Sequence, residues 1–381
     1  MSVFLDQSPV LPQRSNFMQD MKQHKTTSNL NVAARPAFSN EAVNPYNSLL
    51  YRAISNADRI AVHEHQYTML PWRYDILHMH WPEFDVLPRS LGMFDMLKKL
   101  SVWSWLLLAR ASGTKIVWTA HNLFGHDTPP SRLNMFLWKR FISIVDGVIF
   151  LSESSRSAVL EAYPELMKCP STMVRHGHYG PWIDKIRGAA SAPNSQIRRA
   201  LEAIENKFVL LHFGQMRAYK NVDELMRQFS MLEAPDIRLL IAGNVPDRNY
   251  QLKLEALAAV DSRILLLPGH LDDASLVACL DRADLVVLPY RKILNSGSAL
   301  LALSAGKHVV VPAIGSMSEL QCDTGLNALT LFDGPFNADV LRHAIKKIQS
   351  DYAAPPNLEQ YDWTSLGSRT ACFYRDLLER S

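Results

Sequence analysis

The sequence predicts an α/β protein of two doubly wound domains, each a parallel sheet covered by helices, that face a central cleft. Short runs rich in Val, Ile and Leu alternate with longer stretches of helical period along nearly the whole chain, the pattern of such sheets. The 381 residues are too many for one ordinary core and suit two domains of roughly 150–200 residues each. Apolar residues make up 48% and charged residues 20%, which excludes a disordered or fibrous protein.

The alternation divides the chain into five parts. Residues 1–28 are polar without any period, as expected of a loose leader, and residues 29–185 form a first α/β series. Segment 186–206 contains GAASAPNS, a small-residue and proline-containing stretch that predicts an interdomain linker. Residues 207–361 form the second series. Residues 362–381 predict a final helix that we expect to pack back toward the first domain.

The expected elements follow in order. In the first domain we predict strands at 30–34, 59–63, 76–80, 115–119, 147–151 and 172–175, and helices at 46–55, 94–111, 132–143 and 153–162. In the second we predict strands at 208–213, 238–242, 264–267, 285–289 and 308–311, and helices at 222–231, 250–259, 273–281 and 298–305. Such pairs of domains bind their ligand between them, at the carboxyl ends of the strands.

Composition also bounds location and partners. The net charge of +3 gives no overall reason to expect a nucleic-acid partner. The four cysteines are far apart and form no CxxC pattern, which suits a reducing cytoplasm. We find no basic region followed by an apolar run at the amino end, and no stretch of ~18 apolar residues that would span a bilayer. We expect a cytoplasmic protein that is soluble or lies on a membrane surface.

The first candidate for ligand binding follows the strand FVLLHF in the second domain. This strand ends at Gly214, where a glycine lets the backbone approach a ligand closely. Arg217 offers a two-pronged guanidinium and Lys220 a point charge, which together suit the phosphates of a nucleotide diphosphate. Two ordinary surface cations on a solvated loop are the alternative.

A second anion-binding feature lies further along the same domain. The strand DLVVLPY ends near Tyr290, and Asn295, Ser296, Gly297 and Ser298 come just before an apolar helix. Asn and Ser cap helices, and Gly-Ser at a helix start exposes backbone N–H groups at the positive end of the dipole. A plain helix cap is the alternative. Two anion-friendly strand ends in one sheet favour a diphosphate site.

In the first domain, two polar segments end neighbouring strands. DILHMHWPE supplies His80, Trp81 and Glu83, and WTAHNLFGHD supplies the candidates His121, Asn122, His126 and Asp127. Such groups are needed for general acid–base work on an acceptor hydroxyl. The motif His-x-His occurs at 63/65, 78/80 and 176/178, and on a strand both rings would share a face, as in a metallohydrolase. No HExxH spacing supports that alternative, and His78 facing its own core is a further one.

These motifs carry a resemblance. The order of strand, GxxRxxK, strand, Pro, NSGS, helix and AGKHVVVP resembles the donor domain of GT-B glycosyltransferases. The resemblance implies that Arg217, Lys220 and the 295–298 helix start hold the donor diphosphate, and that Gly214, Tyr290 and His176 also belong to the donor site. It implies that the loop around His270 faces the nucleobase and that Glu319 lies where a carboxylate could bond a ribose hydroxyl.

A narrower resemblance covers nearly the whole chain. HMHWPE, HNLFGHD, HGHYGPW, LHFGQMRAYKNVDEL and NSGSALLALS are similar to segments of the β-mannosyltransferases of xanthan-type exopolysaccharide synthesis, from about residue 30 to the 362–381 helix. This resemblance implies GDP-mannose as donor substrate, no cofactor and no metal. It also implies a polyprenyl-diphosphate-linked oligosaccharide as acceptor at the inner face of the cell membrane, with His80, Trp81, Asn122 and His126 near that acceptor.

One departure bears on mechanism. Retaining GT-B enzymes commonly carry an acidic residue before the donor helix and another about eight positions later. Leu301 stands at the second position, and no carboxylate lies between Tyr290 and Gly306, which favours inversion. Inversion needs one general base. Glu83 and Asp127 are equal candidates, because a carboxylate in a dry crevice accepts a proton more readily than one in water. His121 is the third, and Asn122, where some inverting relatives have Asp, cannot serve as a base.

Three other functional classes stay open besides the leading one. A retaining hexosyltransferase with another sugar nucleotide would share the fold. A non-catalytic sugar-nucleotide-binding scaffold would bind donor without turnover, and a metallohydrolase would lose activity on chelation. Membrane contact is expected from two segments that interleave basic and large apolar residues at helical spacing, 97–110 and 132–140, although each could instead be an ordinary helix on the sheet.

Overall fold

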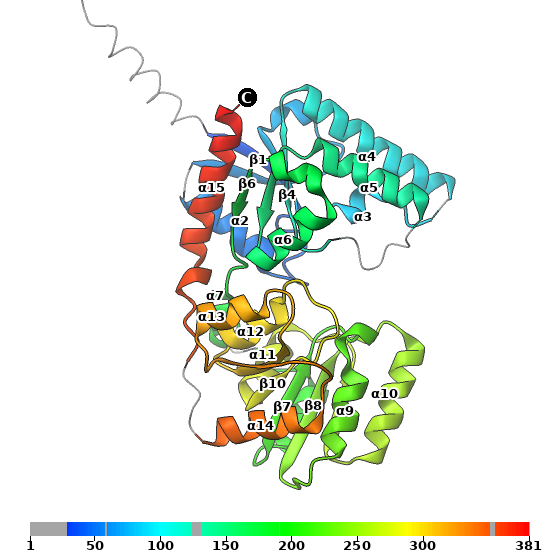
Figure 1. The fold of residues 1–381 in the computed structure, drawn as a ribbon, viewed down its shortest axis with the longest axis vertical. Helices are drawn as coiled ribbons and strands as arrows, with labels where there is room; N and C mark the ends of the chain where they lie inside the picture. The colour runs from blue at the N-terminus through cyan, green and yellow to red at the C-terminus, as the bar shows by residue number, and fades with distance from the viewer. Residues whose placement is uncertain are drawn as a thin grey trace, which may run out of the picture.

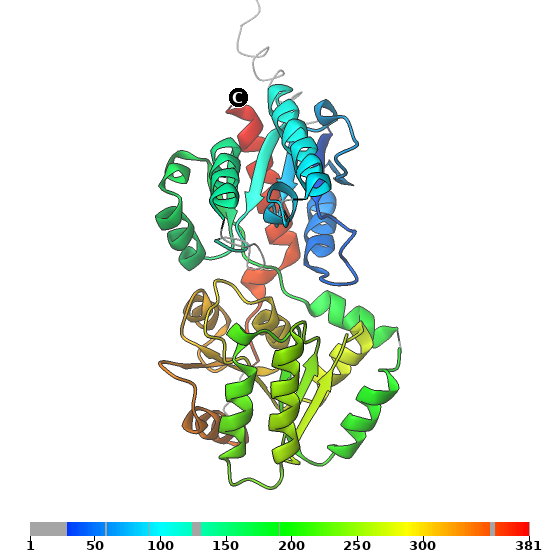
Figure 2. The same cartoon turned by 90° about the vertical axis from the view of Figure 1, so that its right-hand side faces the viewer.

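The computed structural model describes residues 29–57, 59–90, 92–123, 131–189, 191–350 and 355–380, so the expected leader 1–28 lies outside the described residues. The described chain forms two six-stranded sheets in which adjacent strands run parallel. Each sheet lies in its own lobe, one above the other in Figures 1 and 2. The predicted pair of doubly wound α/β domains is therefore confirmed.

The first sheet has the order β2-β1-β3-β4-β5-β6. Its strands are β1 (Leu30–Arg35), β2 (Ile60–Glu64), β3 (Ile76–Met79), β4 (Lys115–Thr119), β5 (Gly147–Phe150) and β6 (Ser171–Met173). Alternate residues of the strands pack on opposite faces, since successive side chains of a strand point to opposite sides. One face is covered by α4 (Met93–Ala111) and α5 (Arg132–Ile144), and the other by α2 (Tyr46–Ala57) and α15 (Trp363–Glu379). The short helices α3 (Glu83–Val86) and α6 (Glu153–Ala162) begin soon after β3 and β5 end.

The second sheet has the order β12-β11-β10-β7-β8-β9. Its strands are β7 (Phe208–Phe213), β8 (Ile237–Gly243), β9 (Ile264–Pro268), β10 (Leu285–Val287), β11 (His308–Pro312) and β12 (Leu329–Phe332). One face carries α7 (Gly180–Gly188), α8 (Ser195–Ala203), α11 (Asp273–Arg282), α12 (Gly297–Ser304) and α13 (Met317–Thr324); the other carries α9 (Val222–Ser230), α10 (Arg248–Val260) and α14 (Ala338–Gln349). The strand order reverses between β7 and β10, and a doubly wound sheet binds its ligand at such a switch point.

The boundary between the lobes differs from the expectation. Segment 186–206 was predicted to be a linker, but it contains α8, whose Ile197 is buried in the second core. Asn194 caps this helix by accepting hydrogen bonds from the N–H groups of Gln196 and Ile197. The Pro-Asn-Ser sequence thus marks a helix start and not a flexible connection. The chain has crossed before this point, because α7 already buries Trp182 in the second core.

The chain also returns to the first lobe. After the 3₁₀ turn Glu359–Tyr361, α15 runs along the first lobe and packs mainly against α2 (Figure 1). The approach is close at Gly367, where a Cβ would lie 2.7 Å from the backbone carbon of Ala53. The two crossing segments are bonded to each other: the His178 N–H donates to the Tyr361 carbonyl (3.0 Å) and the Trp363 indole N–H to the His178 carbonyl (2.7 Å).

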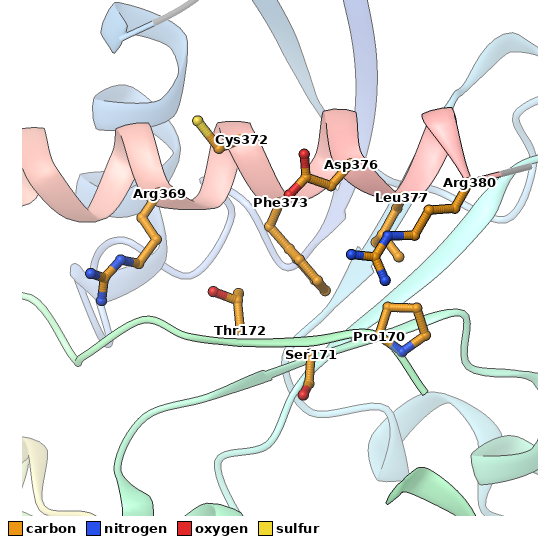
Figure 3. Close-up of a pocket in the computed structure, with 9 residues that line it drawn as sticks. All are labelled: Pro170, Ser171, Thr172, Arg369, Cys372, Phe373, Asp376, Leu377 and Arg380. Atoms are coloured by element: carbon orange, nitrogen blue, oxygen red, sulfur yellow. The ribbon is translucent and has the colours of Figure 1, made fainter. Parts of the chain in front are cut away.

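A surface groove of about 280 Å³ lies between α15 and β6, at the outer edge of the first sheet (Figure 3). Phe373, Leu377 and Arg380 extend from α15 toward β6, whereas the thiol of Cys372 points away from it. None of the residues that line this groove belongs to the cleft between the lobes. Across the described chain, no helix is both long and apolar enough to span a bilayer.

Candidate active site

A cavity between the lobes lies at the switch point of the second sheet. It has a volume of about 540 Å³. The first lobe contributes the turn 42–45, and α7 contributes Tyr179, just before its start, and Trp182. The remaining wall comes from loops and helices at the strand ends of the second sheet: Gly214, Gln215, Gly243, Asn244, His270, Leu271, Asp273, Leu276, Gly297, Ser298 and Leu301. Four residues expected at the donor site therefore line one cavity, namely Gly214, His270, Gly297 and Ser298.

Glycines shape the floor of this cavity. Gly214 has φ +96° and Gly243 has φ +144°, backbone conformations that favour glycine. A Cβ at Gly243 would lie 2.0 Å from the Gly214 carbonyl oxygen, so no other residue fits there. The loop after β7 is further fixed by the Met216 N–H, which donates to the Asn244 carbonyl (2.7 Å). Sequence reasoning missed Gly243 and Asn244, although a glycine at the end of the run RLLIAG could have indicated them.

Lys220 ends the short turn Ala218–Lys220 that follows the β7 loop. Its Nζ lies 5.4 Å from the ring centre of Tyr290 and within 3.8 Å of where a Gly214 Cβ would be. Burial lowers the pKa of Lys220, and the neighbouring Arg217 lowers it further. Within the described chain, no carboxylate forms an ion pair with this ammonium group. A cation held in this way is ready to bind an anion.

The start of α12 provides the second anion-binding feature. Ser296 caps the helix, its Oγ accepting from the Ala299 N–H (3.1 Å). A Cβ at Gly297 would lie 3.3 Å from the Tyr179 hydroxyl and 3.6 Å from Nε2 of His176. The crossing segment therefore packs against the helix start.

Two buried polar groups beside this helix start lack a hydrogen-bond partner among the described residues, the Tyr290 hydroxyl and Nδ2 of Asn295. Buried polar groups without partners are rare in native proteins, so these two groups suit contact with a ligand. Burial raises the pKa of Tyr290 to about 12, which keeps the hydroxyl neutral and able to donate. Asn295 also reaches the first lobe, since its Oδ1 accepts from the Ser152 hydroxyl (3.0 Å).

Glu319 does not line the cavity of about 540 Å³, but it lines a separate, smaller one together with His176, Asn295 and Ser296. Its Oε2 accepts from the Glu153 N–H (2.8 Å), and its Oε1 accepts from the N–H (2.6 Å) and hydroxyl of Ser154. These donors start α6 in the first lobe, where the helix dipole favours a carboxylate. We expected Glu319 at a ribose hydroxyl, but in this arrangement of the lobes both of its oxygens are used by α6.

A cluster of rings lies at the carboxyl ends of β3 and β4 in the first lobe. His80 follows β3, and its Nδ1 lies 3.0 Å from Nε2 of His121. Trp81 stacks on His121 with ring centres 4.7 Å apart. Tyr46 packs edge-on to both histidines and lies 4.2 Å from the ring of His176. The sequence predicted Tyr46 only as the start of a helix, and no motif indicated its place in this cluster.

A chain of hydrogen bonds behind the cluster fixes His121. Nε2 of His80 lies 2.7 Å from the Tyr51 hydroxyl, which also contacts Nδ1 of His78 at 2.8 Å. Nε2 of His78 meets the Thr119 hydroxyl at 2.7 Å, and the Tyr374 hydroxyl contacts Nδ1 at 2.7 Å. His78 is therefore a satisfied core histidine, as one alternative held. Such a network holds the ring of His121 in one orientation.

Burial keeps these imidazoles neutral. It lowers the pKa of His80 and His121 well below the ordinary value, and that of His176 to about 4. Nearby histidines lower the first two further. A neutral ring can hydrogen-bond a sugar hydroxyl, but a base with so low a pKa takes up a proton poorly at neutral pH. This favours a binding role for His121 over the role of general base.

Glu83 is a carboxylate close in sequence to this cluster. It starts α3, two residues after Trp81, and is 5% exposed. Asn122 directly follows His121 and is partly buried. His126 and Asp127, the other predicted residues of this segment, lie outside the described residues. Among the described residues, no group of three or more His, Cys, Asp or Glu side chains is arranged to hold a metal ion.

Comparison with known proteins identifies the enzyme class and the fold. The family model of the glycosyl transferases group 1 matches residues 193–362. The chain is 29% identical over 341 residues, 89% of each chain, to the GDP-mannose:glycolipid 4-beta-D-mannosyltransferase of Xanthomonas campestris. The chain is a glycosyltransferase with the GT-B fold. It resembles the β-mannosyltransferases of the xanthan type, as the motifs indicated.

Solved structures show the same fold. Sucrose-phosphate synthase from Thermosynechococcus elongatus matches with a TM-score of 0.65 at 16% identity, covering 93% of this chain and 100% of that one. HepE of Anabaena in complex with UDP-glucose matches with a TM-score of 0.61 at 15% identity, covering 92% and 99%. At these identities the likeness supports the fold of the glycosyltransferase and not its substrate.

Proposed function

We propose that this glycosyltransferase transfers mannose from GDP-mannose to an oligosaccharide carried on a polyprenyl diphosphate, in bacterial exopolysaccharide synthesis. The observation that carries the proposal is the similarity over 89% of the chain to a mannosyltransferase whose acceptor is a glycolipid. That similarity extends over the first lobe, which faces the acceptor, as well as over the second. The likeness to the Xanthomonas campestris enzyme thus supports both substrates.

The diphosphate of the donor is the leaving group. We assign it to the space between Lys220, Arg217 and the amino end of α12, because these groups present positive charge at neighbouring strand ends of one sheet. They would stabilise the negative charge that develops on the diphosphate as the glycosidic bond breaks. The same groups supply the charge neutralisation for which other transferases use a metal ion, so we propose a metal-independent reaction without a cofactor.

We propose that transfer inverts the anomeric carbon. The side chain of Leu301 stands on α12 where a retaining enzyme would have a carboxylate, and it is 9% exposed. In a single displacement, the acceptor hydroxyl loses its proton to the base and attacks the anomeric carbon while the bond to the diphosphate breaks. Glu83 is the base that we favour, because it is a buried carboxylate two residues after Trp81, whose ring stacks on His121, and Asp127 is the second candidate.

The nucleotide can be tested by thermal denaturation. A ligand that binds only the native state raises the melting temperature, so GDP and GDP-mannose should raise it while UDP and UDP-glucose should not. The reverse pattern would overturn the mannosyl assignment. Binding of GDP-mannose without turnover, when a lipid-linked acceptor is supplied, would favour a sugar-nucleotide-binding scaffold.

The stereochemistry needs the product itself. The coupling constants of the anomeric carbon and proton in the new linkage distinguish a β-mannoside from an α-mannoside. We expect the β-product. An α-product would assign the chain to the retaining hexosyltransferases. Turnover that persists in EDTA is expected, and its loss on chelation would contradict metal independence.

A further inference from the structure

Strand β7 carries one polar side chain, His212, close to its carboxyl end. The run FVLLHF is otherwise apolar, and His212 is 0% exposed. A buried ring of this kind normally has a hydrogen-bond partner at each nitrogen, because an unpaired polar atom away from water costs free energy. An apolar side chain would avoid that cost, so a histidine at this position indicates a use for its ring nitrogens.

One ring nitrogen of His212 fixes the chemical state of the other. Nδ1 lies 2.9 Å from the Val287 carbonyl oxygen, which can only accept, so Nδ1 carries the proton and donates. Burial and the nearby Lys220 lower the pKa of His212 to about 3, which keeps the ring neutral. Nε2 is then a lone-pair acceptor. It is buried and has no hydrogen-bond partner among the described residues, so it suits a donor from its surroundings.

The side chains around His212 belong to the proposed diphosphate site. Its ring centre lies 6.4 Å from that of Tyr290, and the two rings are nearly perpendicular. Nζ of Lys220 lies 5.4 Å from the centre of the same Tyr290 ring. Gly214 comes two residues after His212, and a Cβ there would lie 3.8 Å from Nζ. The ammonium group and the imidazole therefore share one tyrosine ring and one strand end.

The backbone of the turn that carries Lys220 is held in place. The Lys220 N–H donates to the Arg217 carbonyl (2.9 Å), and the Arg291 N–H donates to the Tyr219 carbonyl (2.8 Å). The ammonium group, by contrast, is at the end of a flexible four-carbon stem. The stem leaves the direction of this group open, and an acceptor at a fixed place would set it.

The Tyr290 hydroxyl is a poorer donor to Nε2 than the ammonium group. Burial raises its pKa and the Ser298 and Ser296 side chains lower it, which places the hydroxyl toward the start of α12. The ammonium group has three N–H donors, so it can give one to Nε2 while two remain for phosphate oxygens. Lys220 is therefore the partner that the surroundings of His212 favour.

We propose that His212 is a positioning residue for Lys220. As the diphosphate binds, Nε2 accepts one hydrogen bond from the ammonium group, which directs the other two N–H groups to the phosphate oxygens. This role rests on the assignment of the donor diphosphate to Lys220 in the proposed function. A neutral acceptor suits the task better than a carboxylate, because a carboxylate would compete with the diphosphate for the positive charge. His212 does not line the cavity of about 540 Å³, so its effect passes through Lys220.

The test is GDP binding, measured by calorimetric titration in two variants of His212. In His212→Asn, the amide N–H can still donate to the Val287 carbonyl, but no acceptor remains at the place of Nε2. In His212→Gln, the amide oxygen reaches that place and can accept from the ammonium group. We expect about tenfold weaker binding in His212→Asn, since the lost hydrogen bond is to a charged group, and binding within about threefold of wild type in His212→Gln.

The same substitution in a Lys220→Met background separates positioning from a structural effect. Methionine keeps most of the stem but has neither charge nor donor, so His212→Asn should weaken GDP binding no further there. A loss of about tenfold in both backgrounds would overturn the proposal, because the effect would not pass through Lys220. Binding of GDP by His212→Asn at the wild-type level would overturn it too.

The matched control is His308→Asn. His308 is a buried histidine of the same sheet, 6% exposed, but it begins β11 and so lies at the opposite, amino end of the strands. Its loss should leave GDP binding unchanged, and thermal denaturation of both variants reports any general loss of stability.

The nucleotide itself separates this role from the mannosyl assignment. Wild type that binds UDP and not GDP would count against the mannosyl assignment alone, because the same pair of backgrounds can then be compared with UDP. Wild type that binds neither nucleotide, nor inorganic pyrophosphate, would overturn the role of His212 as well, since that role requires a diphosphate at Lys220.

Discussion

Lys220 is a partly buried cation beside a glycine turn, and its lowered pKa reflects the cost of keeping that charge away from water. A diphosphate would offset this cost. We therefore predict that Lys220→Ala lowers turnover at least about a hundredfold, as does the loss of other groups that stabilise a leaving oxyanion. Arg217→Ala should act in the same direction. Initial rates with GDP-mannose and a lipid-linked acceptor would measure both.

A matched control for these substitutions is Lys346→Ala. Lys346 is an exposed lysine on α14, which covers the face of the second sheet opposite α12. Its loss should leave turnover unchanged. Near-normal rates in the Lys220 and Arg217 variants, with the fold intact by circular dichroism, would mean that the diphosphate binds elsewhere.

The general base can be assigned by two amide substitutions. Glu83→Gln should lower turnover by about a hundredfold or more while the thermal shift caused by GDP stays as in wild type, because the base touches the acceptor and not the nucleotide. Asp127→Asn is the comparison variant. If it abolishes turnover and Glu83→Gln does not, Asp127 is the base.

His65 makes folding sensitive to acid. It is fully buried, neither ring nitrogen has a hydrogen-bond partner among the described residues, and burial, aided by Arg35, lowers its pKa to about 3. In the unfolded chain the pKa is ~6.5, so the unfolded state binds the extra proton below that pH and stability falls as pH falls from ~6.5 toward 3. At pH 5 this amounts to about 2 kcal/mol.

His65→Phe removes that proton-binding site while keeping a ring against Trp105, which lies 4.3 Å away in wild type. We predict that the variant gains about 2 kcal/mol relative to wild type between pH 7 and pH 5, measured by urea denaturation at each pH. His63→Phe, at an exposed position on β2, is the matched control. An equal gain in that variant would assign the effect to another cause.

Some site residues could be predicted from the sequence, and others could not. The helix start 295–298 and the glycine-lysine loop could be predicted because both follow from local chemistry, a cap and a turn. The contact of Glu319 with the start of α6 could not be predicted, because its partners, the N–H groups of Glu153 and Ser154, are more than 160 positions away in sequence. Nor could the ring cluster around Tyr46, which depends on how α2 packs over the strand ends.

Among the elements, α12 shows how a helix start is shaped for a ligand. Gly297 lies where a Cβ would come within 3.3 Å of the Tyr179 hydroxyl. Gly297→Ala should therefore weaken GDP binding several-fold by shifting this helix start, yet leave stability unchanged or slightly higher, since Ala favours helix by ~1 kcal/mol over Gly. Calorimetric titration with GDP and thermal denaturation would measure the two effects. Gly188→Ala in α7, where a Cβ meets no atom within 4 Å, is the control.

Strands and helices with a strong sequence period lie close to their predicted bounds. The strands 115–119 and 208–213 were predicted with the bounds that the structure has. The edge strand β12 was missed, because four apolar residues at a sheet edge give little signal on their own. Helices α13 and α14 were also missed. Helix α8 was interpreted as linker because Gly, Ala and Pro precede its cap.

At the scale of the whole molecule, Glu319 joins the two lobes. Its carboxylate in α13 accepts three hydrogen bonds from the start of α6 and lies 4.0 Å from the Arg175 guanidinium. We predict that Glu319→Ala increases amide hydrogen exchange at Glu153 and Ser154, because these two N–H groups lose their acceptor. Ser365→Ala at the exposed start of α15 is the control. Unchanged exchange in the Glu319 variant would mean that the lobes are held by other contacts.

The paired crossing segments have a mechanical consequence. The two segments that connect the lobes are hydrogen-bonded to each other, at His178–Tyr361 and Trp363–His178, so we expect them to move together and to limit twisting of one lobe on the other. One lobe could still rotate relative to the other about an axis through both segments. The hydrogen bonds between the segments would oppose sliding and twisting of the lobes. Opening of the cleft would then follow one direction. Each closure would bring the sugar nucleotide on the second lobe back to the same position relative to the acceptor hydroxyl on the first.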